Sequence, residues 1–146
     1  MSSNVVHAWT FQGGRHFTIT IGNTAGNATT NLTPTMGKRW ILMRGSITLV
    51  CDATVVNRNI VVQLTDGTSI TTALPLGPNT AATLTSNYYL NEINFNLNGI
   101  VASALNALVG INGILLEGAD QFRILINAGV AGDSYSGYID VLEIDI

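Results

Sequence analysis

The sequence predicts an all-β protein, a β-sandwich or jelly roll of about eight antiparallel strands with at most one short helix. Three observations predict this fold. Apolar and polar residues alternate with a period of two in several segments, most clearly between Arg39 and Leu64. Turn-forming Gly, Asn and Asp residues separate these segments, and only one segment has helical spacing. At 146 residues, the chain is expected to form one domain spanning residues 1–146.

The central stretch is predicted to form two strands joined by a turning connector that contains Asp52 and Asn57. A charge pair between Asp52 and Arg58 would fix the shape of this connector and, if exposed, contribute about 0–1 kcal/mol. The alternation predicts that the following residues face the core: Met43, Ile47, Leu49, Cys51, Ile60, Val62 and Leu64.

The segments before this stretch suggest a hairpin and an arm. Val5–Phe11 and Arg15–Ile21 both alternate, and Gln12-Gly13-Gly14 is a plausible turn between them. Gly22–Gly37 has almost no large apolar residue and is rich in Gly, Asn and Thr. Residues 22–37 are therefore predicted to be a long surface loop or an extended arm that wraps a neighbouring subunit.

After the central stretch, Asp66-Gly67 provides a turn into a short strand at Ser69–Leu74, which Pro75 ends. Ala81–Leu90 is a further strand candidate. Asn91–Asn98 alternates most cleanly of all, and its row of Asn side chains is either a solvated face or a binding face for a flat partner.

The helical candidate is Ile100–Val109, with an apolar loop at a subunit interface as the alternative. Two strands follow at Gly113–Glu117 and Gln121–Asn127, and Gly129–Gly137 is predicted to be a loop. The last strand is Tyr138–Ile146, where two adjacent apolar residues, Val141 and Leu142, indicate a β-bulge.

Composition favours a subunit of an assembly. Apolar residues make up 47% of the chain and charged residues only 10%, against about 25% in typical domains. Such weak solvation suits a surface that is buried against neighbours, although a monomer that hides its apolar residues remains an alternative. The net charge of −3 and six scattered cations argue against a nucleic-acid partner. No secretory signal is visible, and Asn and Gly residues interrupt the only long apolar stretch, so no membrane partner is expected.

Catalytic and metal-binding patterns are not found in the sequence. His7 and His16 lack a third ligand at suitable spacing, and there is no nucleophile elbow, phosphate-binding loop or dinucleotide fingerprint. The single Cys51 is expected to be a buried thiol. We therefore expect neither an enzyme nor a cofactor.

Aromatic residues provide the alternative of a carbohydrate-binding platform, since exposed rings stack on sugars. Tyr88 and Tyr89 must point to opposite faces of an extended strand, so one of them is a candidate for exposure. The platform candidates are Trp40, Tyr88, Tyr89, Tyr135 and Tyr138. The residues predicted to contact a partner are Asn23, Asn27, Asn31, Met36, Trp40, Tyr88 and Tyr135.

A family resemblance rests on three short motifs within roughly Gly37 to Glu143. Asp52-Ala53-Thr54-Val55, then Asn57-Arg58, then Asp66-Gly67-Thr68 follow a pattern in which apolar strands flank a connector. The pattern resembles that of small virion structural proteins of tailed bacteriophages. Downstream, Gly132-Asp133-Ser134-Tyr135 and Val141-Leu142-Glu143 are also similar to that group.

The resemblance implies a β-sandwich protein of the virion and names no catalytic residue. Together with composition, it favours a non-enzymatic capsid decoration (cement) protein on the capsid surface, made in the host cytoplasm. Its expected partners are the major capsid protein and further copies of itself, with a trimer favoured. The alternatives are a neck, tail or fibre subunit of the virion, or a carbohydrate-binding adhesion module.

Overall fold

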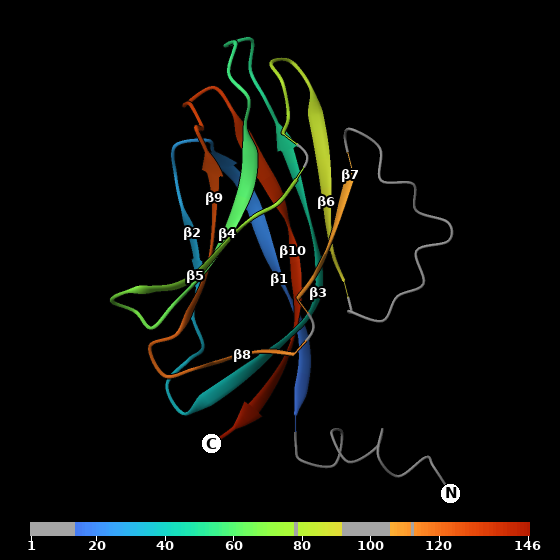
Figure 1. The fold of residues 1–146 in the computed structure, drawn as a ribbon. Coiled ribbons are helices and arrows are strands. Elements are labelled where there is room, and N and C mark those ends of the chain that lie inside the picture. The colour runs from blue at the N-terminus through green and yellow to red at the C-terminus, as the bar shows by residue number, and fades with distance from the viewer. Residues whose placement is uncertain (1–13, 78, 92–105, 112) are drawn as a thin grey trace, which may run out of the picture.

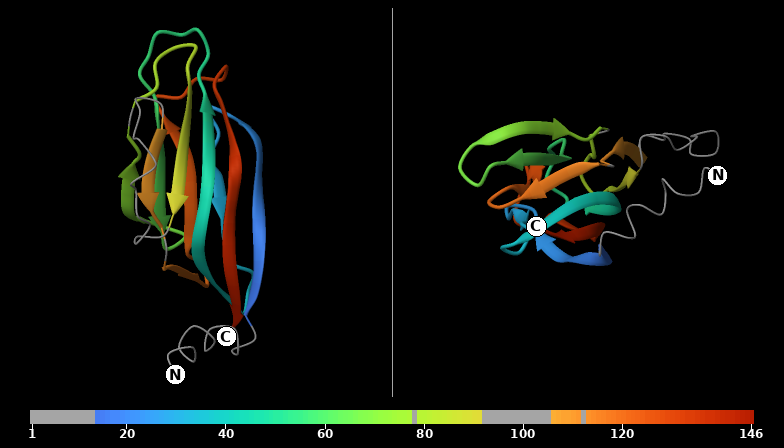
Figure 2. Two further views of the ribbon diagram at one scale, coloured as in Figure 1. Left: turned by 90° about the vertical axis from the view of Figure 1, so that its right-hand side faces the viewer. Right: turned by 90° about the horizontal axis from the view of Figure 1, so that it is seen from below.

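The computed structural model of the protein describes residues 14–77, 79–91, 106–111 and 113–146. These residues form ten strands in two facing sheets, and the described part of the chain contains no helix (Figures 1 and 2). The strands are β1 (Arg15–Ala25), β2 (Thr30–Leu32), β3 (Lys38–Val50), β4 (Asn59–Thr65), β5 (Ile70–Pro75), β6 (Thr85–Asn91), β7 (Asn106–Gly110), β8 (Ile114–Glu117), β9 (Gln121–Asn127) and β10 (Ser134–Asp145). The predicted all-β sandwich is confirmed.

The larger sheet has the order β1-β10-β3-β6-β7, and β8 pairs with the first part of β3. The smaller sheet has the order β2-β9-β4-β5. All pairs are antiparallel except β6 with β7, which run parallel. In Figure 2, β1, β10 and β3 lie side by side as long strands of one layer.

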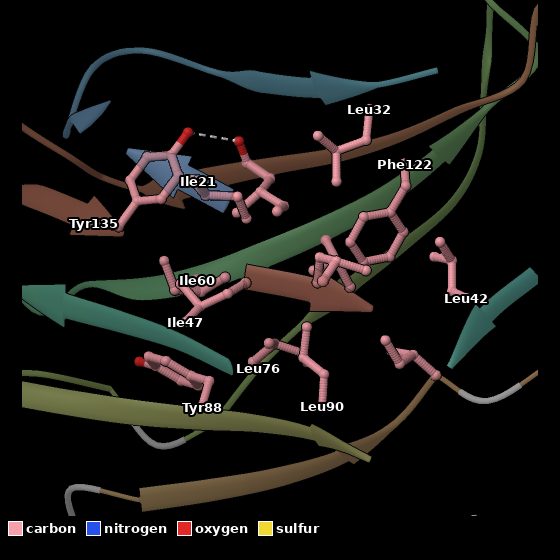
Figure 3. Packing of buried hydrophobic residues seen from close by; sticks show 14 of the residues in the cluster. Ile21, Leu32, Leu42, Ile47, Ile60, Leu76, Tyr88, Leu90, Phe122 and Tyr135 are labelled. Carbon is pink, nitrogen blue, oxygen red and sulfur yellow. Dashed lines mark hydrogen bonds between the residues drawn. The ribbon is translucent and has the colours of Figure 1, made fainter. Parts of the chain in front are cut away.

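The core lies between the two sheets and is filled by the inward residues of β3, β4, β6, β9 and β10 (Figure 3). Two buried tyrosines, Tyr88 and Tyr135, also bind polar groups there, and the Tyr88 hydroxyl lies 3.3 Å from the Thr80 hydroxyl. The Tyr135 hydroxyl donates to the Ile124 carbonyl at 3.0 Å and bonds the Thr30 hydroxyl at 2.8 Å, which joins β10 to β9 and β2. Buried hydroxyl groups need such partners, so these rings contribute to the core as well as to its specificity.

A bulge in β3 changes which residues of that strand face the core. The β10–β3 register passes from Asp140↔Arg44 to Val141↔Leu42, which leaves Met43 as the extra residue. Ile47, Leu49 and Cys51 are buried as predicted, but before the bulge the buried residues are Trp40 and Leu42. The predicted inward position of Met43 is therefore wrong, because one extra residue reverses the alternation of a strand.

The predicted irregularity near Val141 and Leu142 does lie at this point, although the additional residue belongs to the neighbouring strand. Val141, Leu142 and Glu143 are all buried. The Glu143 carboxylate has hydrogen-bond donors at this position, because it accepts from Trp40 Nε1 at 2.8 Å and from Arg15 Nη2 at 3.1 Å.

Residues 22–37 do not form the predicted continuous loop or arm. Strand β1 continues to Ala25, residues 26–29 turn, and Thr30–Leu32 pairs with β9. The Thr-rich sequence is compatible with a strand because β-branched residues suit a pleated surface. The strands with which it pairs, β10 and β9, lie far along the chain, so local sequence did not reveal the pairing. Only the turn at 26–29 and residues 33–37 lie outside the strands.

Other predicted elements differ in extent. Residues 106–109 of the helical candidate lie in β7, so this part of the helix prediction is wrong; its earlier residues lie outside the described part. The candidate strand Val5–Phe11 and all but the first residue of Asn91–Asn98 also lie outside it. Strand β6 begins at Thr85 instead of Ala81, and β10 begins at Ser134, within the predicted loop Gly129–Gly137.

Candidate functional site

Four connections meet at one end of the sandwich, drawn at the top of Figure 1. We call this end the apex and define it by residues 26–29, 52–58, 79–84 and 128–133. The connections are tied together by backbone hydrogen bonds, among them Gly26 N to Asp133 O at 2.8 Å and Thr83 N to Asp52 O at 2.8 Å. The apex is therefore one continuous surface built from both sheets.

An ion cluster of Asp52, Arg58 and Asp133 lies beneath the apex surface and links its loops. The Arg58 side chain is fully buried, with Nη2 2.8 Å from Asp52 Oδ1 and Nε 2.6 Å from Asp133 Oδ2. The Nε–H bond does not point along the Nε–Oδ2 line, so this second contact is an ion pair without hydrogen-bond alignment. Nη1 donates to the Val56 carbonyl at 3.1 Å. The predicted pair between Asp52 and Arg58 is thus present, with the arginine buried and the aspartate partly exposed.

Asp133 does more than pair with Arg58. Its Oδ1 accepts from the Asp52 backbone N–H at 2.9 Å, and its Oδ2 accepts from the Val130 N–H at 2.9 Å. The Asp52 carboxylate accepts from the Thr54 N–H at 2.8 Å, and this hydrogen bond is the largest cause of the lowered pKa of Asp52. A charged side chain is thus used to fix backbone positions in two loops that are 81 residues apart.

The outer surface of the apex mixes apolar and neutral polar side chains. Val55 is 91% exposed, Val56 and Leu84 are also exposed, and the exposed polar residues include Thr54, Asn57 and Thr83. Among the described apex residues, the charged ones are Asp52, Arg58 and Asp133, and all three are used in the cluster. A rigid loop thus presents apolar side chains to solvent, an arrangement typical of a contact surface for another protein.

The opposite end carries most of the charge. Cross-strand ion pairs follow the lower half of the larger sheet: Arg15–Glu143, Lys38–Asp145, Arg39–Glu117 and Arg44–Asp140. Two hollows lie among them. One of about 380 Å³ is lined by His16, Phe17, Thr18, Met43, Arg44, Asp140 and Val141, and one of about 410 Å³ by Arg15, Thr35, Lys38, Glu143 and Asp145.

The residues predicted to contact a partner fall into two groups. Asn23, Asn27, Asn31 and Met36 are exposed, and Met36 is 95% exposed. Asn27 lies in the apex, whereas Asn31 accepts a hydrogen bond from Arg123 Nε at 3.1 Å. The structure does not bring these four residues together into one patch, since Met36 lies at the charged end, two residues before Lys38.

Three predicted contact residues are corrected by their burial: Trp40, Tyr88 and Tyr135. Trp40 packs edge-on against Phe17, with ring centroids 5.7 Å apart, and the two tyrosines lie in the core. The prediction failed because aromatic residue type alone does not separate a ring packed in the core from an exposed one. By contrast, Tyr89 and Tyr138 are exposed, as expected for one member of the Tyr88-Tyr89 pair.

No group of three or more His, Cys, Asp or Glu side chains is placed to hold a metal ion in the part of the chain that is described. His16 is exposed on β1, and His7 lies outside the described residues. Cys51 is buried as predicted, and burial raises the pKa of its thiol. Within the described ranges, no helix has the length and hydropathy to cross a membrane.

The sequence matches no family model and no curated protein. Similar folds occur in virus particles. A chain in the structure of the infectious bursal disease virus Gx strain has 12% identity and a TM-score of 0.41, covering 88% of this chain and 32% of its own. A chain in the crystal structure of the T13 IBDV viral particle has 15% identity and a TM-score of 0.40, covering 90% and 31%. The chain thus spans about a third of these longer proteins.

Proposed function

We propose that the chain is a non-enzymatic structural protein of a virus particle, and specifically a decoration (cement) protein that binds the shell formed by the major capsid protein. The observation that carries this proposal is the apex. Apolar side chains are presented to solvent there on loops that a fully buried arginine holds in place.

A decoration protein needs a preformed contact surface, because ordering a mobile loop on binding would weaken the attachment. The apex meets this requirement through the Arg58 cluster. It also lacks exposed, unpaired charge among its described residues, so docking on a neutral protein surface would not bury an uncompensated ion. The low charge of the whole chain and the resemblance of its central motifs to phage virion proteins support the same role.

Contacts between copies are part of the proposal, with a trimer favoured. Strand β5 is the edge of the smaller sheet, all six of its residues are exposed, and none is charged. An uncharged edge strand is a ready site for pairing with another chain. Strand β5 is therefore the surface at which we expect copies to meet, while the apex faces the shell.

The test is to look for the chain on particles. Particles from cultures in which the gene is expressed are purified, the copies per particle are measured by quantitative mass spectrometry, and antibody labelling in the electron microscope locates them. Many copies spread over the shell are expected. Labelling of the neck, tail or fibres would replace the decoration role with the alternative virion position, and absence from particles would overturn the proposal.

A further inference from the structure

Two exposed tyrosines stand in one row on the outer face of the larger sheet. Tyr138 of β10 pairs with Ser46 of β3, and Ser46 in turn pairs with Tyr89 of β6. Tyr138 is 40% exposed and Tyr89 is 39% exposed, while their chain neighbours Ile139 and Tyr88 are buried on the core side. The two rings therefore belong to the same solvent-facing surface.

The spacing of this row leaves room between the rings. Neighbouring strands lie about 4.8 Å apart, so side chains two strands apart are separated by roughly 10 Å. The residue between them is Ser46, whose side chain is short. Two ring faces with the short Ser46 side chain between them leave room for two sugar rings of one oligosaccharide.

Polar side chains border the row on both sides. On the apex side lie Ser136, Thr48 and Asn87, and the Thr48 hydroxyl donates to Asn87 Oδ1 at 2.9 Å. On the other side, Asp140 accepts from the Thr18 hydroxyl at 2.5 Å and from Arg44 Nε at 2.8 Å.

These three residues also line the hollow of about 380 Å³ described above. Aromatic faces flanked by carboxylate, amide and hydroxyl groups provide both the apolar and the hydrogen-bonding contacts that sugars require.

We propose that this face, centred on Tyr138, Ser46 and Tyr89, is a binding site for a neutral oligosaccharide. The rings stack on the C–H faces of two sugars, and the bordering polar groups bind hydroxyls. The ligand is neutral because Arg44 and Asp140 pair with each other and leave the face without a net charge. This site lies on the face of the larger sheet, separate from the apex, so docking through the apex would leave it uncovered.

The test begins with the intact protein on an array of bacterial and eukaryotic glycans. Soluble hexasaccharides of β-1,4-linked glucose, β-1,4-linked N-acetylglucosamine and α-1,4-linked glucose are then used as probes in titration calorimetry. Binding of at least one neutral glycan is expected. Absence of binding on the array and to all three probes at millimolar concentration would overturn the inference.

Substitutions then assign the site. Tyr89→Ala and Tyr138→Ala should each weaken binding about tenfold, whereas Tyr89→Phe and Tyr138→Phe keep the ring and should stay within about threefold. Leu115→Ala removes an exposed apolar side chain elsewhere and serves as the matched control. Unchanged binding by both alanine variants would overturn the inference, even if a glycan binds.

The two proposals fail separately. If glycan binding is lost in the tyrosine variants but no copies are found on particles, the glycan site is supported and the decoration role is not. If copies are found on particles but no glycan binds, only the decoration role is supported.

Discussion

Arg58 and Asp133 form an ion pair that is closed to solvent on both sides: Nε lies 2.6 Å from Oδ2, and neither side chain has exposed surface. Removing one member of such a pair leaves the other as an uncompensated buried charge. The stability of the apex therefore depends on both residues together.

We expect Arg58→Met to lower the free energy of unfolding by about 3–5 kcal/mol, since Asp133 would be left buried without its cation. Urea denaturation at pH 7 measures this loss. Arg44→Met is the control, because Arg44 pairs with Asp140 at an exposed position and should cost less than about 1 kcal/mol. Equal losses in the two variants would contradict a special role for the buried pair.

The pH dependence of stability should include a contribution from Asp140. Its pKa is lowered by the hydrogen bond from Thr18 and then by Arg44. A carboxyl group with a depressed folded pKa adds stability above its unfolded pKa of about 3.9, and this stability is lost as pH falls through the folded value.

Thr18→Val should therefore reduce the acid sensitivity of the urea midpoint between pH 5 and the acid-unfolding limit, about pH 2–3. Thr20→Val, one row away on the same strand, should leave that sensitivity unchanged. A steeper loss of stability with acid in Thr18→Val would contradict the assignment.

A charge placed at the apex should prevent docking. Val55→Asp and Leu84→Asp are expected to fold with stability within about 0.5 kcal/mol of the native protein, because both side chains are exposed. The number of copies per particle should fall at least tenfold. Leu115→Asp, at an exposed position outside the apex, should bind normally. Full binding by both apex variants would place the contact elsewhere.

Association through β5 can be measured in solution. Ile70→Lys and Leu74→Lys put charges on an exposed edge strand, which is how natural proteins block edge pairing. Light scattering at several concentrations should show a native trimer that persists on dilution and variants that dissociate to monomers. A native monomer at all concentrations would exclude stable association of the free protein.

The sequence predicted the sandwich because period-two alternation depends only on which side chains are buried. It predicted the turns at Asp66-Gly67 and the buried Cys51 for the same local reasons. It missed β2, because Thr30–Leu32 is strand only through pairing with β9, about 90 residues further along the chain. The inward position of Trp40 was missed because the bulge at Met43 is a property of the β10–β3 pair.

The candidate surfaces were less accessible to such reasoning. The alternation of a strand predicts that Tyr88 and Tyr89 face opposite sides of the sheet. The sequence around Tyr89 does not, however, predict that it lies in one row with Ser46 and Tyr138. Likewise, the Asp52–Arg58 pair is local, whereas the contribution of Asp133 to it comes from a loop 75 residues beyond Arg58. Residues that strand pairing brings together from distant parts of the chain can be identified only when the strand order and register are known.

The position of β10 has a consequence for how the protein is made. This strand lies between β1 and β3, yet it is synthesised after every other described strand. During translation, β3 can pair with β6 and β8, but β1 has no strand partner and one edge of β3 stays unpaired until Ser134–Asp145 leaves the ribosome. Until then, the apolar residues of β1 and the unpaired edge of β3 are accessible to chaperones and to other nascent chains. Closing a sheet through such distant contacts is also slow.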